Sequence, residues 1–102
     1  MHDAAARIDA RSAPRDEVRH RARAFGPDGR PLHLLVVNVS AGGLMARCDE
    51  EHAPGDRLRV HLPRLGLVGV EVRWSLGGRI GCRFDTAVPL ARYYELLAAM
   101  RA

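Results

Sequence analysis

Along most of the chain, apolar and polar residues alternate in short segments, and turns that contain glycine or proline separate these segments. Alternation with a period of two places successive side chains on opposite faces of a β-strand. The expected strands are centred on the apolar residues near Val18, Leu32, Leu44, Leu58, Val68 and Ile80. Six short strands of this kind favour a small antiparallel barrel, because closure pairs the strand edges that would otherwise stay exposed.

Three of these segments carry more specific expectations. Between Val18 and Ala24, every second residue is an arginine, which predicts a strand with a basic outer face. Residues 32–39 are nearly all apolar and predict a strand that is covered on both faces. The residues expected to point inward on the last two strands are Val68, Val70, Val72, Trp74, Ile80, Cys82 and Phe84, with Gly77-Gly78 as the hairpin turn between them.

The periodicity changes after the sixth strand. Pro89 suits the first turn of a helix, and apolar residues then recur at spacings of three and four. The expected apolar stripe consists of Leu90, Tyr93, Tyr94, Leu97 and Met100. We therefore predict a mainly β fold, a six-stranded antiparallel barrel followed by a C-terminal α-helix at about 88–101. The stripe would cap the barrel or contribute to a dimer, and both a monomer and a dimer fit it.

A chain of 102 residues is the size of one domain. Residues 1–14 have few large apolar side chains and predict a flexible N-terminal arm, which leaves residues 15–102 for the barrel domain and its helix. Residues 1–15 also lack the apolar centre of a secretory signal, and no apolar run approaches the roughly 18 residues that span a membrane. We therefore expect a cytoplasmic protein without membrane insertion.

All sixteen basic residues are arginines, and the formal net charge is +4. Arginine binds phosphate and guanine through two parallel hydrogen bonds, so this composition permits an anionic ligand without selecting one. Cys48 and Cys82 fall on the apolar sides of their strands and predict buried free thiols rather than a disulfide. The five histidines share no metal-ligand spacing, so we expect no metal site.

Two short polar signatures point to a ligand. Arg11 and Arg15 form an Arg-x-x-x-Arg spacing before the first strand, and such a pair can clamp an anion. Asn38, Ser40 and Gly43 form an Asn-x-Ser-x-x-Gly pattern where an apolar strand ends. The period of a strand puts Asn38 and Ser40 on one side, and the glycine permits close approach of a backbone. Together the signatures point to a small nucleotide with two phosphates.

In this order, the two signatures resemble those of the PilZ domain family of bacterial cyclic di-GMP receptors. The resemblance runs from Arg11 to the C-terminal helix, and residues 80–84 look like the Gly-x-x-Phe strand that commonly closes the barrel in that family. It implies that Arg11, Arg15, Asn38, Ser40 and Gly43 bind cyclic di-GMP, with no cofactor and no catalytic residue. It also implies that the N-terminal arm folds over the ligand and creates a surface that a downstream partner protein recognises.

One departure from the family pattern bears on stoichiometry. Many relatives carry an arginine directly before the Arg-x-x-x-Arg, where this chain has Ala10, and this favours one nucleotide per chain over a stacked pair. Two other functions compete with the receptor: a nucleotide-independent protein adaptor, and a basic barrel that binds nucleic acid through Arg19, Arg21 and Arg23. Few aromatics and the expected inward positions of Trp74 and Phe84 weigh against nucleic acid. An enzyme is disfavoured because Ser40 has no histidine in a recognisable motif.

Overall fold

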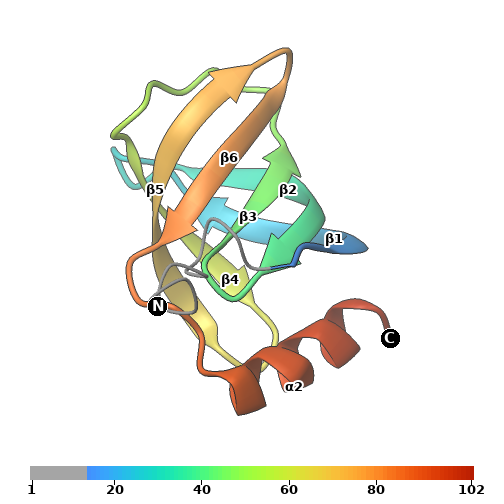
Figure 1. The fold of residues 1–102 in the computed structure, drawn as a ribbon. Helices are drawn as coiled ribbons and strands as arrows, with labels where there is room; N and C mark the ends of the chain where they lie inside the picture. The colour runs from blue at the N-terminus through green and yellow to red at the C-terminus, as the bar shows by residue number, and fades with distance from the viewer. Residues whose placement is uncertain (1–13) are drawn as a thin grey trace, which may run out of the picture.

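The computed structural model describes residues 14–102, which form six strands and one helix (Figure 1). The strands are β1 (Asp16–Phe25), β2 (Pro31–Ser40), β3 (Gly43–Arg47), β4 (Arg57–Leu62), β5 (Gly66–Leu76) and β6 (Arg79–Phe84), and the helix is α2 (Leu90–Met100). The strands pair antiparallel in the closed order β1-β2-β3-β6-β5-β4, with β4 returning to β1. The predicted six-stranded barrel with a C-terminal helix is confirmed. Residues 1–13 of the predicted arm, with Arg11, lie outside the described residues.

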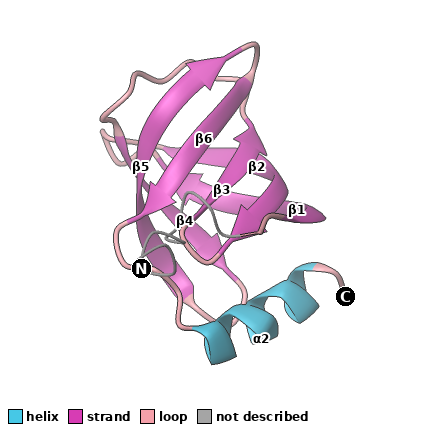
Figure 2. Cartoon of the chain, in the orientation of Figure 1, coloured by secondary structure: helices cyan, strands magenta, loops and turns pink. Residues whose placement is uncertain are grey.

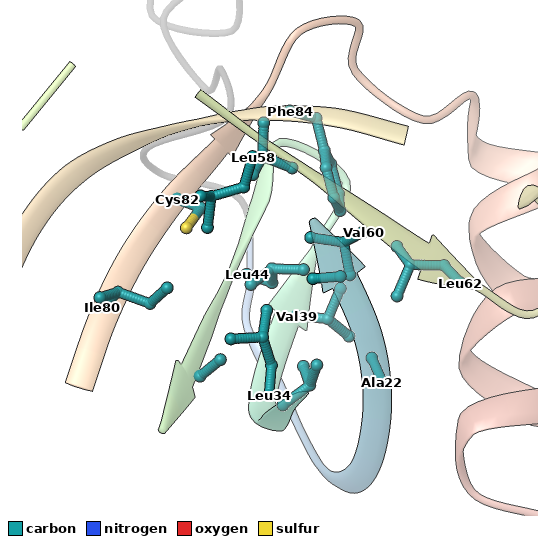
Figure 3. Packing of buried hydrophobic residues seen from close by; sticks show 14 of the residues in the cluster. Ala22, Leu34, Val39, Leu44, Leu58, Val60, Leu62, Ile80, Cys82 and Phe84 are labelled. Carbon is teal, nitrogen blue, oxygen red and sulfur yellow. The ribbon is translucent and has the colours of Figure 1, made fainter. Parts of the chain in front are cut away.

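The interior is filled by aliphatic side chains from all six strands, with one side of α2 beneath them (Figures 2 and 3). Val36, Val39, Val60, Val70 and Val72 are fully buried. The predicted hairpin between β5 and β6 is present, and Gly77 and Gly78 both have positive φ angles (64° and 79°), as a two-residue type I′ turn requires. Within residues 14–102, no helix is long and apolar enough to cross a membrane.

Both cysteines belong to this interior as free thiols, as predicted. Cys82 lies on β6 between Ile80 and Phe84, and all three side chains point into the barrel. Burial raises the pKa of the Cys82 thiol to about 12, and burial also raises the pKa of Cys48. Both thiols are therefore protonated near neutral pH, and they behave as small apolar side chains.

The prediction that residues 32–39 form a strand covered on both faces is wrong. Leu32, Leu34 and Val36 are buried, but His33 between them is exposed, and Leu35 on the same side is half-buried. A closed barrel of six short strands has a single interior, so each strand has one buried face only. The helix contacts β1 and lies at one end of the barrel, where it leaves the outer face of β2 uncovered (Figure 1).

The inward orientation predicted for Trp74 is also wrong. On β5, Val72 pairs with Cys82 while Trp74 pairs with Gly81, so Arg73 is an extra residue without a counterpart on β6. This β-bulge reverses the alternation beyond Val72, because each inserted residue moves the following side chains to the other face. Trp74 is consequently 40% exposed. The argument against nucleic acid that relied on a buried Trp74 therefore does not hold, although Phe84 is buried as predicted.

The helix begins one residue after Pro89, close to the predicted start, but it presents a different face to the barrel. Its buried residues are Tyr93, Leu96 and Met100, which follow one another at spacings of three and four. Leu90 and Tyr94, which belong to the predicted stripe, are exposed. The helix covers only one end of the barrel, so the buried stripe is narrower than the distribution of apolar residues suggests.

Tyr93 connects this helix to the beginning of β1 and the end of β2. Its hydroxyl lies within hydrogen-bonding distance of the Asp16 carboxylate and, at 3.0 Å, of the Val39 carbonyl oxygen. Burial, followed by the hydrogen bond with Asp16, raises the pKa of Tyr93 and keeps the phenol protonated. About two turns further along, the Arg101 guanidinium donates to the Glu17 carbonyl oxygen at 3.0 and 2.6 Å. The C-terminal helix is therefore fixed to the first two residues of β1.

Replacing Tyr93 by phenylalanine tests this connection. We expect Tyr93→Phe to lower the free energy of unfolding by about 1–3 kcal/mol, because it leaves the half-buried Asp16 carboxylate and the buried Val39 carbonyl oxygen without this partner. Urea unfolding followed by circular dichroism measures the change. Tyr94→Phe is the matched control, because Tyr94 is the exposed neighbour. Equal stability of the two variants would contradict the connection.

Candidate ligand-binding site

An open pocket of about 270 Å³ lies where β2 ends, β3 begins and the bulged part of β5 faces β6. Its lining includes Arg15, Ser40, Gly42, Gly43, Arg73, Trp74, Gly81, Cys82 and Arg83. The two signatures predicted from the sequence are far apart along the chain, yet residues of both lie at this pocket. Three of the five predicted ligand-binding residues line it directly, namely Arg15, Ser40 and Gly43.

Asn38 joins the site through Arg15. The Arg15 side chain donates a hydrogen bond from Nη1 to Oδ1 of Asn38 at 2.9 Å. Asn38 lies on β2 and pairs with Glu17 on β1, which explains why the residue just before β1 can reach it. The Asn38 amide nitrogen lies 3.7 Å from the sulfur of Met45, a weak acceptor, so most of its donor capacity remains for a ligand. The predicted Arg11 lies outside the described residues.

Ser40 is 1% exposed and holds the turn between β2 and β3. Its hydroxyl oxygen accepts a hydrogen bond from the Gly42 N–H at 3.3 Å, and Ser40 is the last residue of β2 to pair with β3, opposite Gly43. This is the local side chain-to-backbone bond for which serine is favoured in turns. Ser40 therefore holds the conformation of the β2–β3 turn, which forms part of the lining of the pocket.

Gly43 is required by the neighbouring strand. It pairs with Arg83 on β6, and a Cβ atom at this position would collide with the Cys82 carbonyl oxygen. The sequence suggested that this glycine makes room for a ligand, but the structure gives a reason within the fold itself. Any side chain at residue 43 would push β3 away from β6 and widen the floor of the pocket.

Trp74 lines this site although the sequence pattern placed it inside the barrel. The β-bulge at Arg73 turns the indole outward, and it lies against the backbone of Gly81, where a Cβ atom would overlap the ring. The indole lines the pocket, so it offers an aromatic surface on which a purine base can stack. Residue periodicity assumes an unbroken alternation and therefore cannot reveal a residue that a bulge has reoriented.

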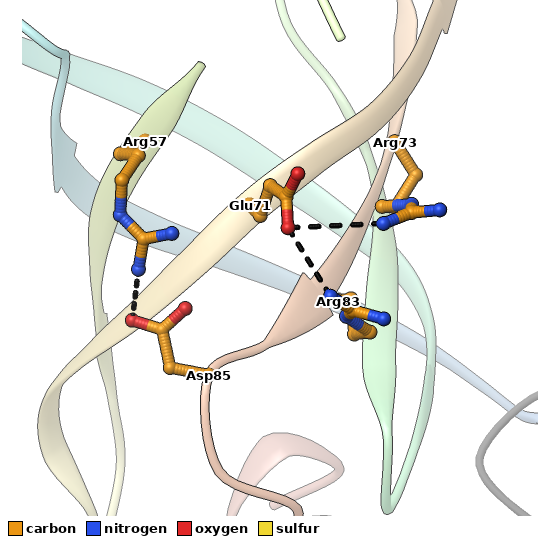
Figure 4. A network of polar contacts seen from close by, with 5 residues as sticks. All are labelled: Arg57, Glu71, Arg73, Arg83 and Asp85. Carbon is orange, nitrogen blue, oxygen red and sulfur yellow. Dashed lines mark hydrogen bonds and ion pairs between the residues drawn. The ribbon is translucent and has the colours of Figure 1, made fainter. Parts of the chain in front are cut away.

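Arginine side chains dominate the charge of the pocket. Arg15, Arg73 and Arg83 line it, and Glu71 forms ion pairs with the latter two at 3.7 and 3.3 Å (Figure 4). One carboxylate cannot neutralise three guanidinium groups, so the pocket attracts anions. Among residues 14–102, no cluster of three or more histidine, cysteine or acidic side chains could hold a metal ion. The arrangement is suited to binding an anionic aromatic ligand.

The contact between Trp74 and Gly81 can be tested by replacing the glycine with a larger residue. We expect Gly81→Val to displace the indole from β6 into solvent, which shifts the tryptophan emission to longer wavelength and increases quenching by acrylamide. Trp74 is the only tryptophan, so its fluorescence reports this position alone. Circular dichroism confirms that the variant is folded. A folded variant with unchanged emission would contradict the described packing.

Comparisons with known proteins identify the fold and the family of the chain. The chain is similar to a solved structure described as the PilZ domain of CeSA from a cellulose-synthesizing bacterium, with a TM-score of 0.61 and 12% sequence identity over 86% of this chain and 95% of that one. No curated protein matches the sequence. The profile of the PilZ domain family matches residues 9–99. PilZ domains bind cyclic di-GMP and act as receptors rather than as enzymes. This chain therefore belongs to the PilZ domain family, and a general role in cyclic di-GMP binding follows from that membership.

Proposed function

We propose that this protein is a cyclic di-GMP receptor that binds the nucleotide in the pocket between Arg15 and Trp74. The observation that carries the proposal is the hydrogen bond from Arg15 to Asn38, because it brings the two signatures together at the edge of one cationic pocket. The ligand-binding residues in this proposal are Arg11, Arg15, Asn38, Ser40 and Gly43, to which the geometry adds Trp74. No cofactor takes part.

The chemistry of these side chains suits the nucleotide. A guanidinium group can bind a phosphate, or the O6 and N7 atoms of guanine, through two parallel hydrogen bonds. Arg15 occupies the Asn38 carbonyl oxygen and leaves the Asn38 amide nitrogen to donate to a guanine edge. Trp74 supplies the surface on which a guanine stacks. The phosphates of the ligand can therefore be bound by arginine, and its guanine bases by Asn38 and Trp74.

The position of Arg15 also provides a means of signalling. Arg15 directly precedes β1, and Arg11 lies four residues earlier, so both guanidinium groups that bind the ligand belong to the segment that leads into the barrel. Ligand binding would place this segment against the barrel and create a composite surface that a downstream partner protein recognises.

Calorimetric titration with cyclic di-GMP tests the receptor function. We expect saturable binding with one nucleotide per chain that excess GTP does not displace. Arg15→Ala should weaken the affinity about ten- to a hundredfold, because it removes a charged hydrogen-bonding partner. Arg79→Ala is the matched control, since Arg79 is an exposed arginine on β6 that does not line the pocket. The proposal fails if tens of micromolar nucleotide does not bind, or if the two variants behave alike.

Trp74 predicts a second, spectroscopic result. Stacking of guanine on the indole should quench the tryptophan fluorescence in a saturable way, with the affinity that calorimetry gives. Trp74→Ala should weaken binding about five- to a hundredfold, which corresponds to about 1–3 kcal/mol for one stacked base, and Trp74→Phe should restore part of the loss. Binding without any change in fluorescence would exclude Trp74 from contact with the ligand.

A further inference from the structure

Arg73 and Arg83 lie at the side of the pocket opposite to Arg15. Around the barrel, the strands that form the pocket follow one another as β2, β3, β6 and β5. Arg15 is bonded to Asn38 on β2, whereas Arg83 lies on β6 and Arg73 on β5. Measured along the curved sheet, β6 is two strand spacings from β2 and β5 is three, about 10 and 14 Å respectively. The pocket therefore carries cationic groups at both ends of a long span.

The two arginines share a single carboxylate. Glu71 Oε1 lies 3.3 Å from Nη2 of Arg83 and 3.7 Å from Nη1 of Arg73, and Glu71 and Arg83 are direct partners in the β5–β6 register (Figure 4). Among residues 14–102, no other carboxylate lies within ion-pair distance of either guanidinium group. The group keeps a net positive charge, because two arginines face one glutamate.

The hydrogen bond from Arg83 to Glu71 and the ion pair of Arg73 with Glu71 leave most of the N–H donors of both arginines free. Each guanidinium has five N–H groups, and the pair with Glu71 occupies only one edge of each. The two side chains remain half exposed, at 52% for Arg73 and 58% for Arg83, so their free edges are open to the pocket and to solvent. By contrast, the neighbouring Asp85 pairs one-to-one with Arg57 on β4 (Figure 4).

The bulge at Arg73 contributes to this arrangement. It places Arg73 and Trp74 next to each other against a single residue of β6, Gly81. A base stacked on Trp74 would therefore have an arginine side chain beside it. The bulge therefore brings an aromatic surface and a cationic group together on this side of the pocket.

We propose that Arg73 and Arg83, positioned by Glu71, form a second anion-binding subsite, which takes one phosphate of the cyclic dinucleotide while Arg15 serves the other. This inference rests on the proposed function and deepens it. With one subsite at each end, the pocket selects a ligand that carries two phosphates over one that carries a single phosphate.

The test compares two double variants that remove the same charge. Arg73→Ala/Arg83→Ala removes the subsite, and Arg47→Ala/Arg79→Ala removes two exposed arginines that pair across β3 and β6 and do not line the pocket. Calorimetry measures cyclic di-GMP, and competition measures GMP, which has one phosphate. We expect the first variant to lose about ten- to a hundredfold in affinity for cyclic di-GMP and less than threefold for GMP. The control variant should lose less than threefold for both.

Two outcomes would overturn the subsite. In one, the two double variants bind cyclic di-GMP equally well. In the other, the subsite variant loses affinity for cyclic di-GMP and GMP by the same factor, which is the effect of overall charge. The single variants Arg73→Ala and Arg83→Ala keep the test valid if the double variant does not fold.

If the wild type binds no cyclic di-GMP, the proposed function itself fails. If Arg15→Ala abolishes binding while Arg73→Ala/Arg83→Ala matches its control, only the subsite fails.

Discussion

The pairing of β1 with β4 closes the sheet, and most other features of this molecule depend on that closure. Once the sheet is closed, every strand has one face inside and one outside, so a single inserted residue moves a whole strand end from one environment to the other. Closure also pairs the strand edges within the barrel, and the short strands fill the interior mainly with valine and leucine side chains. The pocket therefore lies on the outside of the barrel, at places where the chain departs from regular alternation.

The pocket depends on two such departures. The bulge on β5 turns Trp74 out of the interior, and Gly81 on the adjacent strand provides the space for its indole. The tight pairing of β3 with β6 requires glycine at residue 43, which keeps Arg83 close to the β2–β3 turn. Neither glycine needs a ligand to explain it. Both are requirements of strand packing, and the site makes use of the surface that this packing creates.

Regular alternation and turn residues were sufficient to predict the six strands, the Gly77-Gly78 hairpin and the barrel, because these features depend on local sequence. The two signatures also predicted that residues distant in the chain share one site, and Arg15 and Asn38 do meet. Trp74 was placed on the wrong face because a bulge leaves no trace in the pattern of apolar residues. The outward side of β2 was misjudged because half-buried Leu35 and Val37 resemble residues of a covered strand.

Arg73 and Arg83 were missed for another reason. In a chain with sixteen arginines, an arginine at an outward strand position looks like any solvated residue. Only the register of β5 against β6 shows that Glu71 holds these two beside the pocket. The sequence also could not predict which face of α2 is buried. The apolar residues of the helix extend over more of its surface than the end of the barrel can cover.

The hydroxyl of Tyr93 has a mechanical consequence for this site. Asp16 directly follows Arg15, and Val39 lies between Asn38 and Ser40, so this single phenol contacts the neighbours of three proposed ligand-binding residues. The path from the pocket to the helix is therefore one peptide unit and one hydrogen bond long. A displacement of Arg15 cannot be absorbed within a flexible loop, because Asp16 and Glu17 are both tied to α2. The start of β1 and the C-terminal helix are therefore directly connected, and the other side of that helix exposes Leu90 and Tyr94 to solvent.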